Sequence, residues 1–283
     1  MNALAPARKS KATAAKRPAK RKRAKPDPIT AWKRRLERYR AGLAAYVRDG
    51  LASIYGRPTW HRRLDPTSEL ILTILTQNSA DVNAEKAYEA LCKAYPGDGA
   101  PEQHDLGVGW GGVGLQPTVT PDWMRVEFAP TEELIDVIRP GGLAPQKAPR
   151  LQASLRKIRE RSGDYSLEFL GDMPAIEARA WLTGIDGVGK KTASIVLLFS
   201  FGMPLMPVDR HVERVAKRIG LIPAKASPDD AHEHFLALLE PDQMYEAHVN
   251  LIQHGRRICH AQRPEHDRCP VAARCRFVDP KAP

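Results

Sequence analysis

Apolar residues recur at helical rather than strand-like intervals along most of this 283-residue chain. The spacing predicts a helix between residues 30 and 56, and another over 66–75 that Pro66 opens and Thr67 or Ser68 caps. Further predicted helices cover residues 82–94, 131–139, 146–162, 167–173, 175–183, 192–201, 209–220, 229–239 and 243–257. Because no run of alternating strands appears, the pattern predicts an all-α fold.

Residues 97–128 break this pattern. Seven glycines lie between Gly97 and Gly114, interleaved with Trp110, and prolines follow. Glycine and proline interrupt regular structure, so the segment predicts a long loop. A short strand is expected at residues 124–128.

The positive charge of the chain is concentrated at its beginning. The formal net charge is +11, and residues 1–28 contain ten Lys or Arg and one Asp. The remaining 255 residues are therefore nearly neutral. A basic segment with almost no apolar residues predicts a disordered tail. It would tether DNA non-specifically, or serve only as a solubilising tail or address signal.

The apolar and cysteine content of the chain limits the cellular compartments in which we expect the protein. No apolar run is long enough to cross a bilayer, and no apolar signal-peptide core follows the start. Three of the four cysteines lie within residues 259–275, which favours a metal site in a reduced compartment over a disulfide scaffold. We expect a cytoplasmic, nucleoid-associated protein, or a nuclear one if the source is eukaryotic.

Residues 182–192 carry the most informative motif, Leu-Thr-Gly-Ile-Asp-Gly-Val-Gly-Lys-Lys-Thr. Glycine tolerates the backbone angles of a tight turn, and the amides of the turn and of the next helix can face a phosphate. The candidate DNA contacts are Gly187, Val188, Gly189, Lys190 and Thr192.

This hairpin, together with Lys191 and the later Val-Asp-Arg-His around Asp209, resembles the helix-hairpin-helix DNA glycosylases, most closely the endonuclease III branch. The resemblance runs from about residue 60 to residue 276. It implies that Lys191 is a Schiff-base nucleophile and that Asp209 stabilises the developing positive charge or activates the attacking group. The position of Lys191 at a helix N-terminus would disfavour its ammonium form. The alternatives are a phosphate contact for Lys191 and a helix cap for Asp209.

The resemblance also implies residues that read the lesion once the target base has left the stack. Gln77 or Asn78 would face the orphaned base, and Leu143 would act as the apolar wedge. Alternatively, Asn78 caps the next helix and Leu143 is a core contact. Asp81 would shape the base pocket or cap a helix, and His211 is as readily structural as catalytic.

Two helical domains follow from the resemblance, with DNA lying across the cleft between them. A six-helix domain would span residues 59–203, with the helix-hairpin-helix at about 176–201. Residues 29–58 and 204–283 would form a second domain that carries the metal loop. Residues 97–128 have no counterpart in the endonuclease III pattern and are expected to be an insert. The resemblance suggests a monomer.

The cysteine loop keeps the family spacing with one departure. The family pattern Cys-x6-Cys-x2-Cys-x5-Cys appears as Cys259-x6-His266-x2-Cys269-x5-Cys275. The resemblance implies a [4Fe-4S] cluster with Cys3His ligation, while zinc or a metal-free loop are the alternatives. We expect Cys92 to be a buried apolar residue rather than a ligand.

The function implied is that of a bifunctional DNA glycosylase and abasic-site lyase of base excision repair. Its partner would be double-stranded damaged DNA, and its substrates oxidised pyrimidines. The alternatives are a glycosylase for uracil, mispaired thymine or another base, or a non-catalytic protein that binds DNA or senses damage.

Overall fold

The computed structural model describes residues 26–107 and 110–282, so most of the basic tail lies outside the described residues. The described residues form helices and loops without named strands, which confirms the all-α prediction. The α-helices are α1 (Pro28–Tyr39), α2 (Leu43–Tyr55), α3 (Pro66–Thr76), α4 (Asp81–Ala94), α5 (Trp123–Phe128), α6 (Thr131–Ile138), α7 (Ala144–Ser162), α8 (Ala175–Thr183), α9 (Lys190–Phe201), α10 (Arg210–Ile219), α11 (Pro228–Leu238) and α12 (Met244–Arg257). Short 3-10 turns are η1 (Arg139–Gly141), η2 (Glu168–Asp172), η3 (Pro241–Gln243), η4 (His266–Arg268) and η5 (Ala272–Arg274). Within the described ranges, none of the helices has the length and apolar character that a membrane crossing requires.

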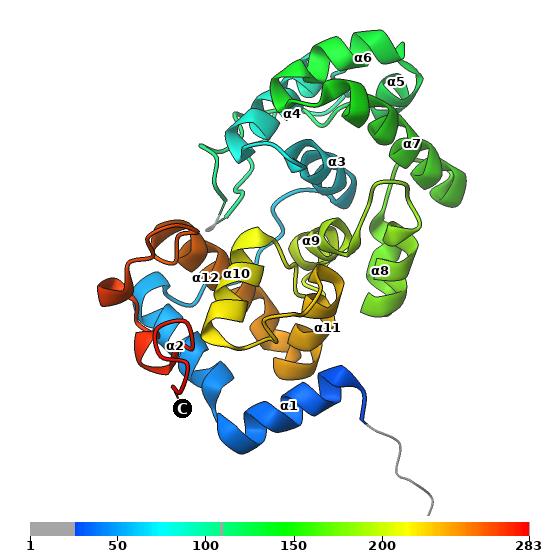
Figure 1. Cartoon of the computed structure of the whole chain (residues 1–283). Helices are drawn as coiled ribbons and strands as arrows, with labels where there is room; N and C mark the ends of the chain where they lie inside the picture. The colour runs from blue at the N-terminus through cyan, green and yellow to red at the C-terminus, as the bar shows by residue number, and fades with distance from the viewer. Residues whose placement is uncertain (1–25, 108–109, 283) are drawn as a thin grey trace, which may run out of the picture.

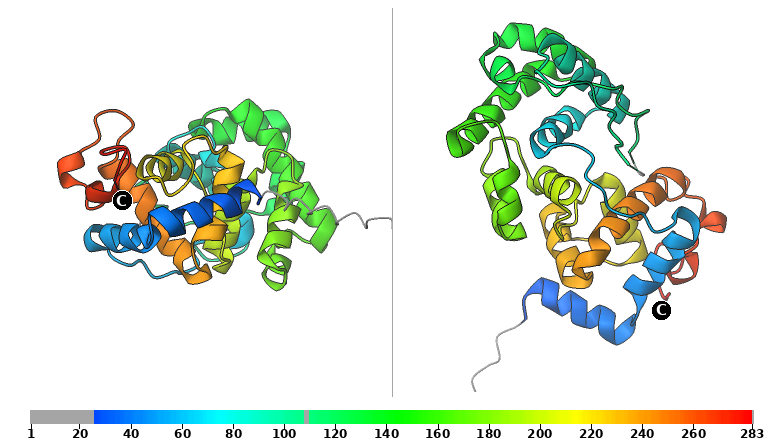
Figure 2. Two further views of the ribbon diagram at one scale, coloured as in Figure 1. Left: turned by 60° about the horizontal axis from the view of Figure 1, so that its bottom comes forward. Right: turned by 180° about the vertical axis from the view of Figure 1, so that it is seen from behind.

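The helices pack around two apolar clusters. The first draws its residues from α3–α9, and the second from α1, α2, α10–α12, the end of α9 and the cysteine loop. In Figure 1, α3–α7 occupy one part of the molecule and α1, α2 and α10–α12 the other, with α8 and α9 between them. The view from behind in Figure 2 shows the same arrangement. The predicted domain boundaries stay a prediction, but helix α9 contributes to both clusters and therefore lies at their junction.

Several local predictions were wrong. Residues 30–56 form two helices rather than one, because Arg40 ends α1 and Gly42, at φ 71°, begins α2. The cap of α3 is neither Thr67 nor Ser68 but Asp65, whose carboxylate accepts both of their backbone N–H groups at 3.0 Å. Asp is a favourable N-cap, because its carboxylate accepts backbone N–H groups that have no partner within the first turn of the helix.

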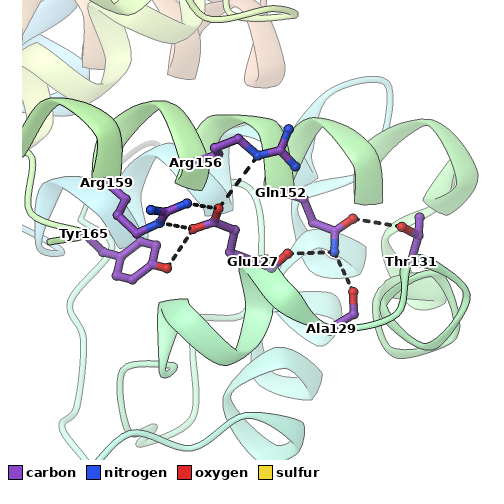
Figure 3. A network of polar contacts seen from close by, with 7 residues as sticks. All are labelled: Glu127, Ala129, Thr131, Gln152, Arg156, Arg159 and Tyr165. Atoms are coloured by element: carbon purple, nitrogen blue, oxygen red, sulfur yellow. Dashed lines mark hydrogen bonds and ion pairs between the residues drawn. The ribbon is translucent and has the colours of Figure 1, made fainter. Parts of the chain in front are cut away.

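The expected strand at residues 124–128 is the helix α5, capped by Asp122. Its end is fixed by Glu127, whose side chain is almost fully buried. Arg159 of α7 donates two hydrogen bonds of 2.8 Å to that carboxylate, and the Tyr165 hydroxyl donates another of 2.7 Å (Figure 3). These hydrogen bonds, led by the pair from Arg159, hold the pKa of Glu127 below its ordinary value. A local cap, Asp122, therefore begins this short helix, and a long-range ion pair joins its end to α7.

The predicted helix at residues 167–173 is only the 3-10 turn η2. The remaining predicted helices are present with shifts of a few residues at their ends. Residues 97–107 and 110–122 run mainly as loop, with isolated bridges between Pro96 and Pro121 and between Glu102 and Thr118. The core is thus built mainly by helices, and the glycine-rich segment contributes Leu106 and Leu115 to it.

Candidate active site and nucleic-acid interface

The glycine hairpin joins α8 to α9 and presents the start of α9. Gly187 has a φ of 81°, which favours glycine, and the Val188 amide closes the turn by donating to the Ile185 carbonyl at 3.0 Å. Val188 is buried in the first cluster and so fixes the hairpin to the core. Gly189 is the N-cap of α9, which therefore begins with Lys190 and Lys191.

Lys191 and Asp209 line one cleft between the two apolar clusters. Lys191 comes from the first turn of α9, and Asp209 is the N-cap of α10. The Asp209 carboxylate accepts the Val212 amide at 2.7 Å, so this residue does cap the helix. The cap fixes the carboxylate at the edge of the cleft, half-buried and facing the same space as the lysine. The Lys191 amine and the Asp209 carboxylate therefore line the same cleft, while their catalytic roles stay a prediction.

Behind this pair the cleft is lined by residues that the sequence did not single out. Arg63 is buried and donates to both oxygens of Glu69, at 2.8 and 2.5 Å. Its guanidinium lies 3.7 Å from the centroid of the Phe199 ring and 5.5 Å from that of Trp110. Arg63, Phe199 and Trp110 all line the cleft together with Lys191. No sequence signal identified Arg63, because its partners lie in α3, α9 and the glycine-rich segment.

His248 of α12 is the second residue that sequence reasoning missed. It is buried at the cleft, and its Nδ1 lies 3.0 Å from the Pro207 carbonyl. Burial lowers the pKa of His248 to about 4, although the nearby Asp209 carboxylate acts in the opposite direction. The imidazole is therefore neutral at physiological pH, and Nδ1 carries the proton that it donates to Pro207.

The residues predicted to read the lesion lie around the end of α3. The Gln77 amide donates to the Gly187 carbonyl at 3.2 Å and to the Thr192 hydroxyl at 3.3 Å, so it links α3 to the hairpin. Thr192 is itself buried, and its hydroxyl accepts the hydrogen bond from Gln77. Asn78, at φ 51°, lines the cleft beside Lys191.

Leu143 lies in a separate loop before α7. It has a φ of 52° and its side chain is 43% exposed, which does not match the alternative of a core contact. The buried Lys147 fixes this loop, because its Nζ donates to the Gly141 carbonyl at 2.8 Å and to the Leu75 carbonyl at 2.6 Å. Burial lowers the pKa of Lys147 to about 8. One lysine thus ties the loop of Leu143 to the end of α3, just before Gln77.

Three other candidates have clear partners. Lys190 donates to Glu233 at 3.0 Å, and a DNA phosphate would have to compete with that carboxylate. Asp81 pairs with Arg256 at 2.8 Å and lines the cleft. Arg214 donates to His211 Nδ1 at 3.2 Å, and burial lowers the pKa of this histidine. His211 also lines the outer part of the cleft.

The cysteine loop surrounds a small cavity of its own. Cys259, Cys269 and Cys275 line it together with His266 and the buried His254. His254 Nε2 lies 3.5 Å from Cys269 Sγ, whereas His266 is exposed and tilted against the Phe277 ring. Sequence spacing identified His266 but not His254, which precedes the motif. Cys92 lies apart, buried in the first apolar cluster, where burial raises its pKa to about 11.

The three cysteine thiols line one cavity without forming a site for a single ion in the described residues. In the described part of the chain, no group of three or more His, Cys, Asp or Glu side chains is close enough to bind one metal ion. A zinc ion with bonds of about 2.3 Å to sulfur needs such convergence.

Comparison with known proteins agrees with this geometry. The family model for the HhH-GPD superfamily base excision DNA repair proteins matches residues 71–241, more than half of the chain. The chain belongs to this superfamily. It is 30% identical over 208 residues to an endonuclease III of Sulfolobus acidocaldarius, covering 74% of this chain and 80% of the relative. An endonuclease III of Thermotoga maritima is 30% identical over 220 residues, covering 78% and 87%.

Among solved structures, the HhH-GPD chain resembles a trapped covalent intermediate of endonuclease III with DNA. The TM-score is 0.64 at 25% identity, covering 84% of this chain and 96% of that one. The family and these relatives support a DNA glycosylase of base excision repair, which confirms the resemblance stated from the sequence. The roles of individual residues stay predictions.

Proposed function

We propose that this protein is a bifunctional DNA glycosylase and abasic-site lyase that removes oxidised pyrimidines from double-stranded DNA. The observation that carries the proposal is the shared cleft of Lys191 and Asp209 between the two apolar clusters. A nucleophilic amine joins base removal to strand cleavage, since it forms a covalent link at the sugar. We further propose that the protein acts as a monomer and that the clusters mark two domains.

In the proposed reaction, the neutral Nζ of Lys191 attacks C1′ and the damaged base departs with the electrons of the glycosidic bond. Opening of the sugar ring yields a protonated Schiff base. Loss of a 2′ proton then expels the 3′ phosphate by β-elimination. The Asp209 carboxylate stabilises the positive charge that develops on the sugar, and its cap on α10 keeps it oriented.

The proposed DNA contacts surround this pair. The amides from Gly187 to Thr192, at the hairpin and the N-terminus of α9, face a phosphate, with Lys190 beside them. Asn78 at the cleft and Leu143 at the exposed loop before α7 occupy the space of the extruded base, and Gln77 braces the hairpin.

Borohydride trapping tests the proposal directly. Duplexes with thymine glycol, 5-hydroxyuracil, uracil, mispaired thymine or a plain abasic site are incubated with the full chain and reductant, and covalent adducts are counted. We expect adducts with the oxidised pyrimidines and the abasic site, and none with Lys191→Gln. Lys157→Gln, an exposed lysine of α7, is the matched control and should trap like the unaltered chain. Undiminished trapping by Lys191→Gln would reject the nucleophile.

Two other outcomes would redirect the assignment. Adducts with uracil or mispaired thymine but not with oxidised pyrimidines would replace the substrate class and keep the lyase. An unaltered chain that binds these duplexes without forming any adduct would reject the bifunctional enzyme in favour of a non-catalytic DNA-binding protein.

We also propose that Cys259, His266, Cys269 and Cys275 bind a [4Fe-4S] cluster. The position of the three thiols and His266 around one cavity, at the spacing of the family pattern, supports the assignment. When bound, the cluster would cross-link a loop that has few apolar residues of its own. Iron and sulfide content and the visible spectrum of His266→Ser and His254→Gln test the ligand set. Loss in His266→Ser alone supports the assignment, and loss in His254→Gln alone transfers the role to the buried histidine.

A further inference from the structure

The glycine-rich segment reaches from the first apolar cluster into the cleft. Its described residues 105–107 and 110–114, called here the Trp110 loop, extend toward α12 in Figure 1 and in the rear view of Figure 2. Trp110 lines the cleft that also contains Lys191 and Asp209. The segment that has no counterpart in the endonuclease III pattern therefore supplies a wall of the candidate active site.

Two carboxylates of α4 hold this loop in place. The buried Glu85 accepts hydrogen bonds from Trp110 Nε1 at 2.5 Å and from the amides of Val113 and Gly114 at 3.0 and 2.7 Å. Asp81 accepts the Gly111 amide at 3.0 Å while it pairs with Arg256. Trp110 is thus anchored by its polar edge, and its ring, which packs in part against the first apolar cluster, also lines the cleft.

The glycines of the loop permit this close approach. A Cβ atom on Gly111 would overlap the carboxylate of Asp81 and the guanidinium of Arg256, and one on Gly112 would overlap Glu85. By contrast, a Cβ atom on Gly99 would meet only Val119, at an ordinary 3.8 Å. The sequence Trp-Gly-Gly therefore fits a loop pressed against two carboxylates.

The residues around the Trp110 ring determine which kind of base this part of the cleft can bind. Trp110, the Arg63 guanidinium and Phe199 form a group of flat surfaces in the cleft that the half-buried Asp209 also lines. Flat aromatic surfaces stack on planar bases. A pyrimidine saturated at C5 and C6 is puckered and loses much of that contact.

We infer that Trp110 is a specificity-determining residue that stacks on the extruded base and favours oxidised pyrimidines whose ring stays planar over saturated ones. The inference rests on the proposed function. It deepens that function by naming the planar subclass of substrate and the loop that selects it.

Single-turnover excision from duplexes with 5-hydroxyuracil or thymine glycol tests this inference, with trapping at an abasic site as reference. Trp110→Ala should lower the rate on 5-hydroxyuracil by about tenfold or more and on thymine glycol by less than about threefold. Trapping at the abasic site, which has no base to stack, should change by less than about threefold. Trp110→Phe should recover most of the loss, because its ring remains.

Val113→Ala is the matched control, since Val113 is in the same loop and 85% exposed. Gly112→Ala displaces the loop without removing the indole and should lower the same rate ratio, whereas Gly99→Ala should not. An unchanged ratio, or an equal loss on both bases and on the abasic site, would overturn the inference. Failure of the unaltered chain to trap at any duplex would instead overturn the proposed function and the inference with it.

Discussion

The hairpin and the Trp110 loop are both rich in glycine, and both deliver a side chain to the same cleft, yet they are held in different ways. The turn of the hairpin is formed locally, by the positive φ of Gly187 and a hydrogen bond between Val188 and Ile185, although Val188 and Gln77 also join it to the core. The Trp110 loop is set from a distance, by Glu85 and Asp81, which precede Trp110 by 25 and 29 positions. A loop determined by its own backbone is readable from the sequence, whereas a loop determined by remote carboxylates is not.

Removal of the remote anchor should have the largest effect. Glu85→Ala leaves Trp110 Nε1 and the Val113 and Gly114 amides without their acceptor. We expect the free energy of unfolding to fall by about 4 kcal/mol, measured by chemical denaturation. Glu89→Ala, on the next turn of α4, removes a single hydrogen bond from Gln116 and should cost about 1 kcal/mol. Equal losses would mean that the loop is not anchored at Glu85.

The second prediction concerns His248, which lies in the cleft that the two loops share. We expect the free energy of unfolding to fall at acid pH because of this residue. Burial lowers the pKa of His248 from 6.5 to about 4. Between these values the unfolded chain binds a proton that the folded chain does not. The contribution of His248 to stability is therefore complete above pH 6.5 and is lost as pH falls toward 4, by roughly 3 kcal/mol in all.

His248→Asn isolates this effect, because an amide can still donate to Pro207 but does not titrate in this range. Denaturation midpoints from pH 7 to pH 4 should fall less steeply in this variant than in the unaltered chain. His104→Gln, in the glycine-rich segment, should keep the steep dependence. Identical curves for all three proteins would show that His248 is not the acid-sensitive group.

The smallest loss of stability is expected from a substitution in the hairpin, because it changes only the strain at one backbone angle. Gly187→Ala places a side chain at φ 81° and should lower the free energy of unfolding by about 1 kcal/mol. The added Cβ would lie 3.0 Å from Arg150 Cδ, which belongs to a flexible side chain and can move. Gly189→Ala, at φ −87° with no neighbouring atom within 4 Å, should leave the thermal midpoint nearly unchanged. A larger loss at Gly189 would contradict this account of the hairpin.

The fold class and most helices could be predicted because helical periodicity is local. Two of the errors involve a distant partner, whereas the wrong cap of α3 was a local misassignment. Residues 124–128 form α5, and the buried ion pair between Glu127 and Arg159 joins it to α7. Residues 30–56 are divided at Arg40, whose guanidinium donates to the Ile219 carbonyl at 2.9 Å.

The candidate site divides in the same way. Lys191, Asp209 and the spacing of the cysteines were found from the sequence, because each belongs to a short motif with its own local geometry. Arg63, His248 and His254 were missed, since each is defined by burial and by partners from other helices. Trp110 was noticed only as part of a loop, with no indication of where that loop lies.

The sequence by itself therefore determined the helices, the hairpin that presents Lys191, and the family to which the chain belongs, because these depend on residues close together in the chain. Only the tertiary structure decided that Trp110 and Lys191 line one cleft. That meeting depends on the packing of α4 against the glycine-rich segment and on the buried carboxylates that draw the segment inward. Such contacts join residues far apart in the chain, and neither partner carries a local pattern that names the other.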